Sequence, residues 1–124
     1  MRPRSKKLTE QELEIMKVVW QLQPATVRDV YETMLKERKI AYTSVMTIMN
    51  IMTQKRHLRR HLAERSYVYE ATRPRSEILK EVVGDFLNRM FNGSAEPLVL
   101  YLARNRFVSQ KELESIVRMI KERA

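Results

Sequence analysis

The 124-residue chain has no cysteine, two glycines, four prolines and 7% aromatic residues. A chain without cysteine forms no disulfide, no thiolate metal site and no thiol redox switch, which fits a reducing cytoplasm. The scarcity of glycine, proline and aromatic residues, beside many Met, Leu, Glu, Lys and Arg residues, argues against a sheet-rich or disordered protein. The composition therefore predicts a mostly α-helical protein.

Several kinds of segment and site are also missing. No apolar run reaches the roughly 18 residues of a membrane-spanning helix, and the amino terminus, MRPRSKK, leads into polar sequence without the apolar core of a signal peptide. We therefore expect a cytoplasmic protein without membrane insertion. There is no cysteine nucleophile, glycine-rich phosphate loop or Ser/His/acid constellation, so we predict neither an enzyme nor a cofactor. His57 and His61 share a predicted strand face, but two histidines without a third ligand are usually surface residues, and we predict no metal site.

What the chain has instead is a net charge of +9, unevenly distributed. Residues 1–73 contain 15 Lys and Arg against 8 Asp and Glu, whereas residues 74–124 contain 9 against 7. A cationic surface favours polyanions through phosphate contacts and counterion release. Charge alone does not separate DNA from RNA or from an anionic membrane, and it also fits a basic protein without a nucleic-acid partner.

Three amphipathic helices are predicted in the amino-terminal half. The first begins at a capping box from Thr9 to Glu12 and ends before Pro24, because proline disfavours helical geometry in the preceding residue. The second begins at Thr26, after which apolar residues recur at helical spacing, and the third covers about residues 41–55. Three short helices around one core are typical of a helix-turn-helix lobe.

The third predicted helix carries two stripes of residues. The apolar stripe consists of Val45, Ile48, Met49 and Met52, and the polar stripe of Thr43, Thr47, Asn50 and Gln54. Neutral hydrogen-bonding groups on an outer face, where Lys and Glu usually lie, are suited to a specific contact. In the major groove of DNA, Asn can bond adenine bidentately, and Thr or Met can meet the methyl group of thymine. The predicted base contacts are Thr43, Ser44, Met46, Thr47 and Asn50. The alternative is a solvated helix face.

The segment after this helix is basic. The helical period is lost after residue 55, and apolar residues at spacings of two and four predict an antiparallel hairpin that turns at residues 63–66. Beside a DNA-reading helix, such a hairpin would act as a wing that contacts phosphate, and helix N-termini would present amides to phosphate. The predicted phosphate contacts are Thr26, Arg28, Tyr42, Gln54, Lys55, Arg56, Arg59, Arg60 and Arg65. Tyr42 is equally suited to the core, and the alternative for the hairpin is simple solvation.

The termini of the chain add two further predictions. Residues 1–7 contain Arg2, Arg4, Lys6 and Lys7, and we interpret them as a flexible basic arm, with solubility as the alternative role. At the other end, a long helix is predicted over residues 75–91, where Gly93 can take the left-handed conformation that ends helices. Ser94 is predicted to open a second helix, and a capping box at Ser109 a third.

These last three helices are more apolar than about fifty residues can bury by themselves. We therefore predict a homodimer with two domains, a winged-helix DNA-binding domain at residues 1–73 and a helical dimerisation domain at residues 74–124. The predicted dimer interface consists of Ile78, Leu79, Val82, Val83, Phe86, Leu87, Met90, Phe91, Leu98, Leu102, Leu113, Ile116, Val117 and Ile120.

Four segments together resemble the penicillinase-repressor family: LTEQELEIMKVVW, TVRDVYETMLKERKI, AYTSVMTIMN and ERSYVY. The resemblance runs from Leu8 through the last helix, and the combined pattern is more specific than any one segment. It implies a homodimeric winged-helix repressor that binds a palindromic operator and often controls β-lactam resistance or metal homeostasis genes. In that family the amino-terminal lobe binds DNA and the carboxy-terminal helices form the dimer, as the residues here predict.

The chain departs from the family pattern at three places. Many members have Gly where this chain has Arg56, which must accept left-handed geometry at a cost of roughly 1 kcal/mol unless the turn differs. Ile51 stands where many members have Arg, so either a contact with the DNA backbone is lost or the residue turns inward. β-lactam-responsive members are cut at an Asn-Phe bond where this chain has Tyr101-Leu102, which argues against release by that proteolysis. A regulatory sensor-protease stays open as a partner, indicated if a neighbouring gene encodes one. Copper-responsive members use Cys-X-Cys pairs, which this chain lacks.

The resulting prediction is a sequence-specific repressor that binds a double-stranded DNA operator, of the kind that controls antibiotic-resistance or stress-response genes. Two alternatives stay open. One is a basic nucleic-acid-binding or architectural protein of low specificity, and the other is a helical protein-interaction module whose apolar helices bind a partner.

Overall fold

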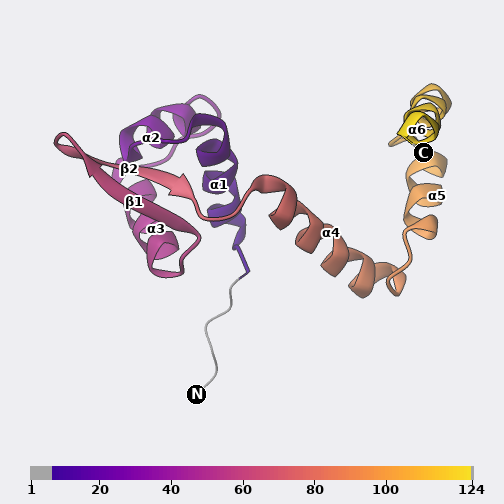
Figure 1. Cartoon of the computed structure of the whole chain (residues 1–124), viewed down its shortest axis with the longest axis horizontal. Helices are drawn as coiled ribbons and strands as arrows, with labels where there is room; N and C mark the ends of the chain where they lie inside the picture. The colour runs from indigo at the N-terminus through magenta and orange to yellow at the C-terminus, as the bar shows by residue number, and fades with distance from the viewer. Residues whose placement is uncertain (1–6, 124) are drawn as a thin grey trace, which may run out of the picture. The chain divides into compact units, whose positions relative to one another are not determined.

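The computed structural model describes residues 7–123 of the chain. Its elements are α1 (Glu10–Leu22), α2 (Val27–Leu35), α3 (Tyr42–Gln54), β1 (Leu58–Ala63), β2 (Ser66–Ala71), α4 (Arg75–Phe91), α5 (Glu96–Arg104) and α6 (Gln110–Arg123). The predicted mostly α-helical fold with one β-hairpin is confirmed (Figure 1). The chain divides into two compact units, Met1–Ile78 and Leu79–Ala124. None of the helices described is long and apolar enough to cross a membrane.

The helices of the first unit begin in two different ways. At α1 the Glu12 amide donates to the Thr9 hydroxyl (3.1 Å), and the Thr9 amide donates to the Glu12 carboxylate (2.9 Å). At α2 Thr26 and Asp29 form the same reciprocal pair, with both distances 3.0 Å. These bonds satisfy amides that the first turn of a helix leaves without partners. In contrast, α3 begins after Ala41 with no side-chain cap.

The first unit has one apolar core. Its most deeply buried large side chains are Ile15, Val19, Val30, Val45, Met49, Met52 and Leu58. The core side of α3 packs against α1, α2 and β1. The hairpin is joined to the loop between α1 and α2 because the Tyr69 amide donates to the Ala25 carbonyl (2.7 Å) and the Ala25 amide donates back (3.1 Å). The hairpin and the outer face of α3 are therefore held in place by the same core.

The turns of the hairpin use residues other than glycine. Leu58 pairs with Ala71 and Ala63 with Ser66, so the turn falls on Glu64 and Arg65. Arg56, before the hairpin, has φ of 67°. It therefore takes the left-handed conformation, and the turn does not avoid this geometry. The Thr72 hydroxyl donates to the Arg56 carbonyl at 2.7 Å, which supports this turn. Ile51 is 38% exposed, so it does not turn inward.

The expectation that both histidines lie on the surface is wrong for His57. This side chain is only 8% exposed and precedes β1, whereas His61 lies within β1 and is exposed. The His57 amide donates to the Met52 carbonyl at 2.8 Å, so the left-handed turn directs the residue inward. Among the residues described, no three His, Cys, Asp or Glu side chains are grouped so that they could hold a metal ion.

The second unit contains most of α4, all of α5 and all of α6. Asn92 (φ 51°) and Gly93 (φ 81°) end α4 in the left-handed region, as predicted for the glycine. The prediction that Ser94 opens the next helix is wrong. The Ser94 amide donates to the Phe91 carbonyl (3.0 Å) in the turn that closes α4, and Ala95 is the residue that precedes the next helix. The next helix, α5, starts two residues after Ser94, where Pro97 fits the first helical turn.

The last helix begins at the predicted capping box. The Ser109 amide donates to the Glu112 carboxylate (2.9 Å), and the Glu112 amide donates to the Ser109 hydroxyl (3.1 Å). Neither α5 nor α6 has a buried residue. Large apolar side chains of this unit remain well exposed, with Met90 at 66% and Ile120 at 62%. The amphipathic pattern therefore has no matching core within one copy of these helices.

Candidate nucleic-acid interface

The outer face of α3 is neutral, polar and accessible. Val45, Met49 and Met52 are buried on the core side, as predicted. The predicted base-contact residues lie on the other side: Thr43, Ser44, Met46 and Thr47 are exposed, and Asn50 is half-buried. The same sequence that packs α3 into the core therefore presents hydroxyl, thioether and amide groups outward.

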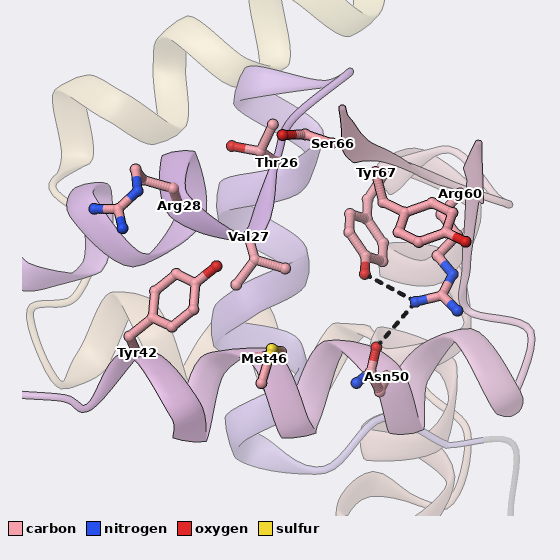
Figure 2. Close-up of a pocket in the computed structure, with 10 residues that line it drawn as sticks. Thr26, Val27, Arg28, Tyr42, Met46, Asn50, Arg60, Ser66 and Tyr67 are labelled. Carbon is pink, nitrogen blue, oxygen red and sulfur yellow. Dashed lines mark hydrogen bonds between the residues drawn. The ribbon is translucent and has the colours of Figure 1, made fainter. Parts of the chain in front are cut away.

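A cleft of about 390 Å³ lies between α3, the start of α2 and the hairpin (Figure 2). Its walls bring together six of the predicted DNA-contacting residues: Thr26, Arg28, Tyr42, Met46, Asn50 and Arg60. Four lining residues were not predicted as contacts: Val27, Ser66, Tyr67 and Tyr69. The spacing of Tyr67 and Tyr69 predicted the second strand but no contact with DNA. Both tyrosines lie on this face because Arg60 pairs with Tyr69 across the hairpin.

Arg60 is the most connected side chain of the cleft. Its Nη1 atom donates to the Asn50 amide oxygen (3.2 Å) and to the Tyr69 hydroxyl (3.3 Å). Its guanidinium carbon lies 4.2 Å from the centre of the Tyr67 ring, within the range of a cation–π contact. The hydrogen bond with Tyr69 raises the pKa of Arg60. Arg60 thus connects both strands of the hairpin to α3.

A second cation–aromatic group lies at the other end of the cleft. The Arg28 guanidinium is 5.4 Å from the centre of the Tyr42 ring, and Tyr31 meets Tyr42 edge to face at 5.4 Å. Tyr42 is half-buried, packs against the core and lines the cleft, so it lies both at the edge of the core and in the wall of the cleft. The Thr26 hydroxyl oxygen accepts a hydrogen bond from the Asp29 amide as a helix cap. The hydrogen of this hydroxyl is then what Thr26 can donate to a ligand.

Lys55 has a different environment from the other predicted phosphate contacts. Its Nζ lies 2.9 Å from a carboxylate oxygen of Glu12, and only 19% of its side chain and 4% of the Glu12 side chain are exposed. Burial raises the pKa of Glu12, but the hydrogen bonds from the Thr9 amide and Lys55 outweigh it, and the net shift is downward. Burial lowers the pKa of the neighbouring His57, whose Nε2 has no hydrogen-bond partner among the described residues. Lys55 is therefore one member of a partly buried ion pair with Glu12.

The remaining predicted phosphate contacts are exposed and lie outside the cleft: Gln54, Arg56, Arg59 and Arg65. Arg59 follows the alternation of β1 and lies on the face opposite Arg60, with its guanidinium 3.8 Å from the Glu70 carboxylate. Of the predicted basic arm, Arg2, Arg4 and Lys6 lie outside the described residues, and Lys7 is exposed.

Comparison with known proteins places the chain among regulators. A family model described as penicillinase repressor matches residues 8–122. The penicillinase repressor of Staphylococcus aureus is 22% identical over 105 residues, which cover 85% of this chain and 83% of that protein. The penicillinase repressor of Bacillus licheniformis is 25% identical over 115 residues, covering 93% and 90%. A solved structure of a ZitR mutant from Lactococcus lactis aligns with 98% of this chain and 77% of its own, at 16% identity and a TM-score of 0.47.

Proposed function

Because the chain belongs to the penicillinase repressor family, whose members are DNA-binding transcriptional regulators and not enzymes, we propose that it represses transcription as a homodimer bound to a palindromic operator. The observation that carries this proposal is the cleft in which the polar face of α3 meets Arg28 and Arg60. A neutral polar helix suits base edges, and cationic flanks suit the phosphates on either side.

The proposed contacts divide into two sets. Base edges are read by Thr43, Ser44, Met46, Thr47 and Asn50 of α3. Phosphates are bound by Thr26, Arg28, Tyr42, Gln54, Arg56, Arg59, Arg60 and Arg65. Lys55 is not included, because its ammonium group is paired with Glu12. We assign it a role in holding the end of α3 against the start of α1.

The proposed dimer is supported by the apolar surface of the second unit. Most of the interface residues predicted above are exposed or half-buried in a single copy, whereas Ile78 is already buried and is left out of the proposed seam. Exposed apolar side chains on this scale mark an interaction surface. A two-fold dimer also presents two α3 helices, which matches the symmetry of a palindrome.

Our proposal for the regulated genes rests only on the names of the relatives. Both relatives named above are penicillinase repressors, so we propose an antibiotic-resistance or stress-response gene as the target. The Tyr101-Leu102 bond lies inside α5. It stands where β-lactam-responsive members have the Asn-Phe bond that is cut, so we do not propose release by that proteolysis.

The test begins with genomic fragments that the full-length protein retains, which identify a palindrome. This duplex is then titrated against a scrambled duplex of the same length and base composition at the same salt concentration. We expect the palindrome to bind about 10³-fold more tightly or better. Equal affinities would refute sequence-specific repression and favour a low-specificity binder. Sedimentation at micromolar concentration should show a dimer, and a stable monomer would favour the protein-interaction module.

A further inference from the structure

Asn50 on α3 and Arg60 on β1 face each other across the cleft, joined by the 3.2 Å hydrogen bond from Arg60 Nη1 to Asn50 Oδ1. A guanidinium group has only donors, so the Asn50 amide can meet it only with its oxygen. The amide nitrogen of Asn50 then points away from Arg60, as Figure 2 shows. The contact therefore decides which end of the amide is left for a ligand in the cleft.

Arg60 is itself held by two neighbours. Its guanidinium lies over the ring of Tyr67 (4.2 Å), and its Nη1 atom also donates to the Tyr69 hydroxyl (3.3 Å). Both Nη1 hydrogens are thus used, one by Asn50 and one by Tyr69. What remains is the edge formed by Nε and Nη2, the parallel pair of donors that matches two oxygens of a phosphate.

We propose that Arg60 is a positioning residue for base readout, and that it makes Asn50 a reader of base edges that offer acceptors only. This inference rests on the proposed DNA-binding function. Bidentate readout of adenine needs the Asn oxygen to accept from the adenine amino group, but that oxygen faces Arg60. The free amide hydrogens of Asn50 instead suit guanine, which presents N7 and O6, or thymine, which presents O4.

The geometry also links this base contact to the DNA backbone. When the free edge of Arg60 binds a phosphate, the same guanidinium still holds the Asn50 oxygen through Nη1. Loss of Arg60 should therefore change two properties at once, the preferred base and the salt dependence of binding. Arg59 is the matched control, since it is the adjacent arginine on the opposite face of β1 and has no contact with Asn50 among the described residues.

The experiment selects binding sites from a randomised duplex library with the full-length protein and its Asn50→Ala, Arg60→Met, Arg60→Lys and Arg59→Met variants. The wild type should select guanine or thymine at one position of each half-site, with about tenfold preference over adenine. Asn50→Ala should lose this preference. Arg60→Met should free the amide to rotate and admit adenine at the same position, with a salt slope lower by about one unit. Arg60→Lys should restore the salt slope but not the base preference, and Arg59→Met should change the slope alone.

Asn50→Asp keeps an acceptor for Arg60 but removes the donor, so it tests the inference even if Arg60→Met does not fold. Its preferred base should become cytosine, whose amino group donates to a carboxylate. Selection of adenine by the wild type, or base preferences unchanged in Asn50→Ala and Arg60→Met, would overturn the inference and leave the repressor function standing. Selection of no site at all by the wild type would overturn both.

Discussion

Replacing Lys55 with methionine separates a lysine that supports the fold from one that contacts DNA. The change keeps an unbranched aliphatic side chain and removes the ammonium group that lies 2.9 Å from the Glu12 carboxylate. Only 4% of the Glu12 side chain is exposed, so the variant leaves a carboxylate without its counterion where water reaches it poorly. We expect the protein to lose stability while keeping the proposed phosphate contacts of the other residues.

The size of the stability loss depends on the hydrogen bond that Glu12 keeps in the variant. Removing one partner of a fully buried ion pair costs about 3–5 kcal/mol. The cost here should be lower, because the Thr9 amide still donates to Glu12 at 2.9 Å and Lys55 is 19% exposed. One hydrogen bond to a charged group contributes about 1.5–3 kcal/mol, so we expect a loss of about 2 kcal/mol, which lowers Tm by roughly 10 °C in a unit of this size.

The loss should also depend on pH. Although burial raises the pKa of Glu12, the hydrogen bonds of Thr9 and Lys55 bring it below its ordinary value of 4.5. A lowered carboxylate pKa stabilises the folded state above the unfolded pKa, and this stabilisation disappears as the pH falls through the folded pKa. The difference in unfolding free energy between wild type and Lys55→Met should therefore be full near neutral pH and shrink as the pH drops below about 4.5.

The assay combines urea unfolding with duplex titrations over a range of salt concentrations, at a temperature where both proteins are folded. Lys55→Met should keep the wild-type salt slope, whereas Arg59→Met, whose side chain is 66% exposed, should lower it by about one unit. A Lys55→Met protein with wild-type stability and a reduced slope would refute the structural role and return Lys55 to the phosphate contacts.

Three further predictions follow from single residues. Phe86→Asp should place a charge in the proposed dimer seam at a cost of several kcal/mol and yield monomers or an unfolded second unit in sedimentation. Asn88 lies on the same helix, is exposed and is not part of the proposed seam, so Asn88→Asp should leave the dimer intact; a stable Phe86→Asp dimer would contradict the seam. Arg56→Gly should raise the unfolding free energy by about 1 kcal/mol in urea, because Arg56 has φ of 67°, and no gain would mean that its turn is not strained. Burial lowers the pKa of His57, so stability should fall as the pH drops below about 6.5, where the unfolded histidine binds a proton first; in His57→Gln this part of the thermal-unfolding pH profile should flatten.

The elements of the chain could largely be predicted from local signals. Capping boxes at Thr9 and Ser109, the left-handed Gly93 and the helical spacing of apolar residues are properties of a few neighbouring residues. Such signals depend on the chemistry of one turn and do not need the rest of the fold. Within the described residues 7–123 they place the six helices and the hairpin, but they put the start of α5 at Ser94, two residues before this helix begins.

The environment of single side chains could not be predicted in the same way. The pairing of Lys55 with Glu12 joins residues that are 43 positions apart, and the contact of Arg60 with Asn50 depends on how the hairpin crosses α3. Spacing within one segment carries no information about such contacts. For this reason the sequence indicates a basic wing but does not separate a lysine that holds the fold from arginines that face the cleft.

The absence of buried residues in α5 and α6 has a consequence for how the protein behaves in a cell. If these helices become stable only by association, mass action governs their folding, and every tenfold dilution removes about 1.4 kcal/mol from the stability of the assembled state. A fall in the number of copies would then act twice, by leaving fewer molecules to occupy the proposed operator and by unfolding the helices of the proposed dimer seam. Under the proposed function, repression would then be lost over a narrower range of protein concentration than for a protein that stays folded and only dissociates from DNA.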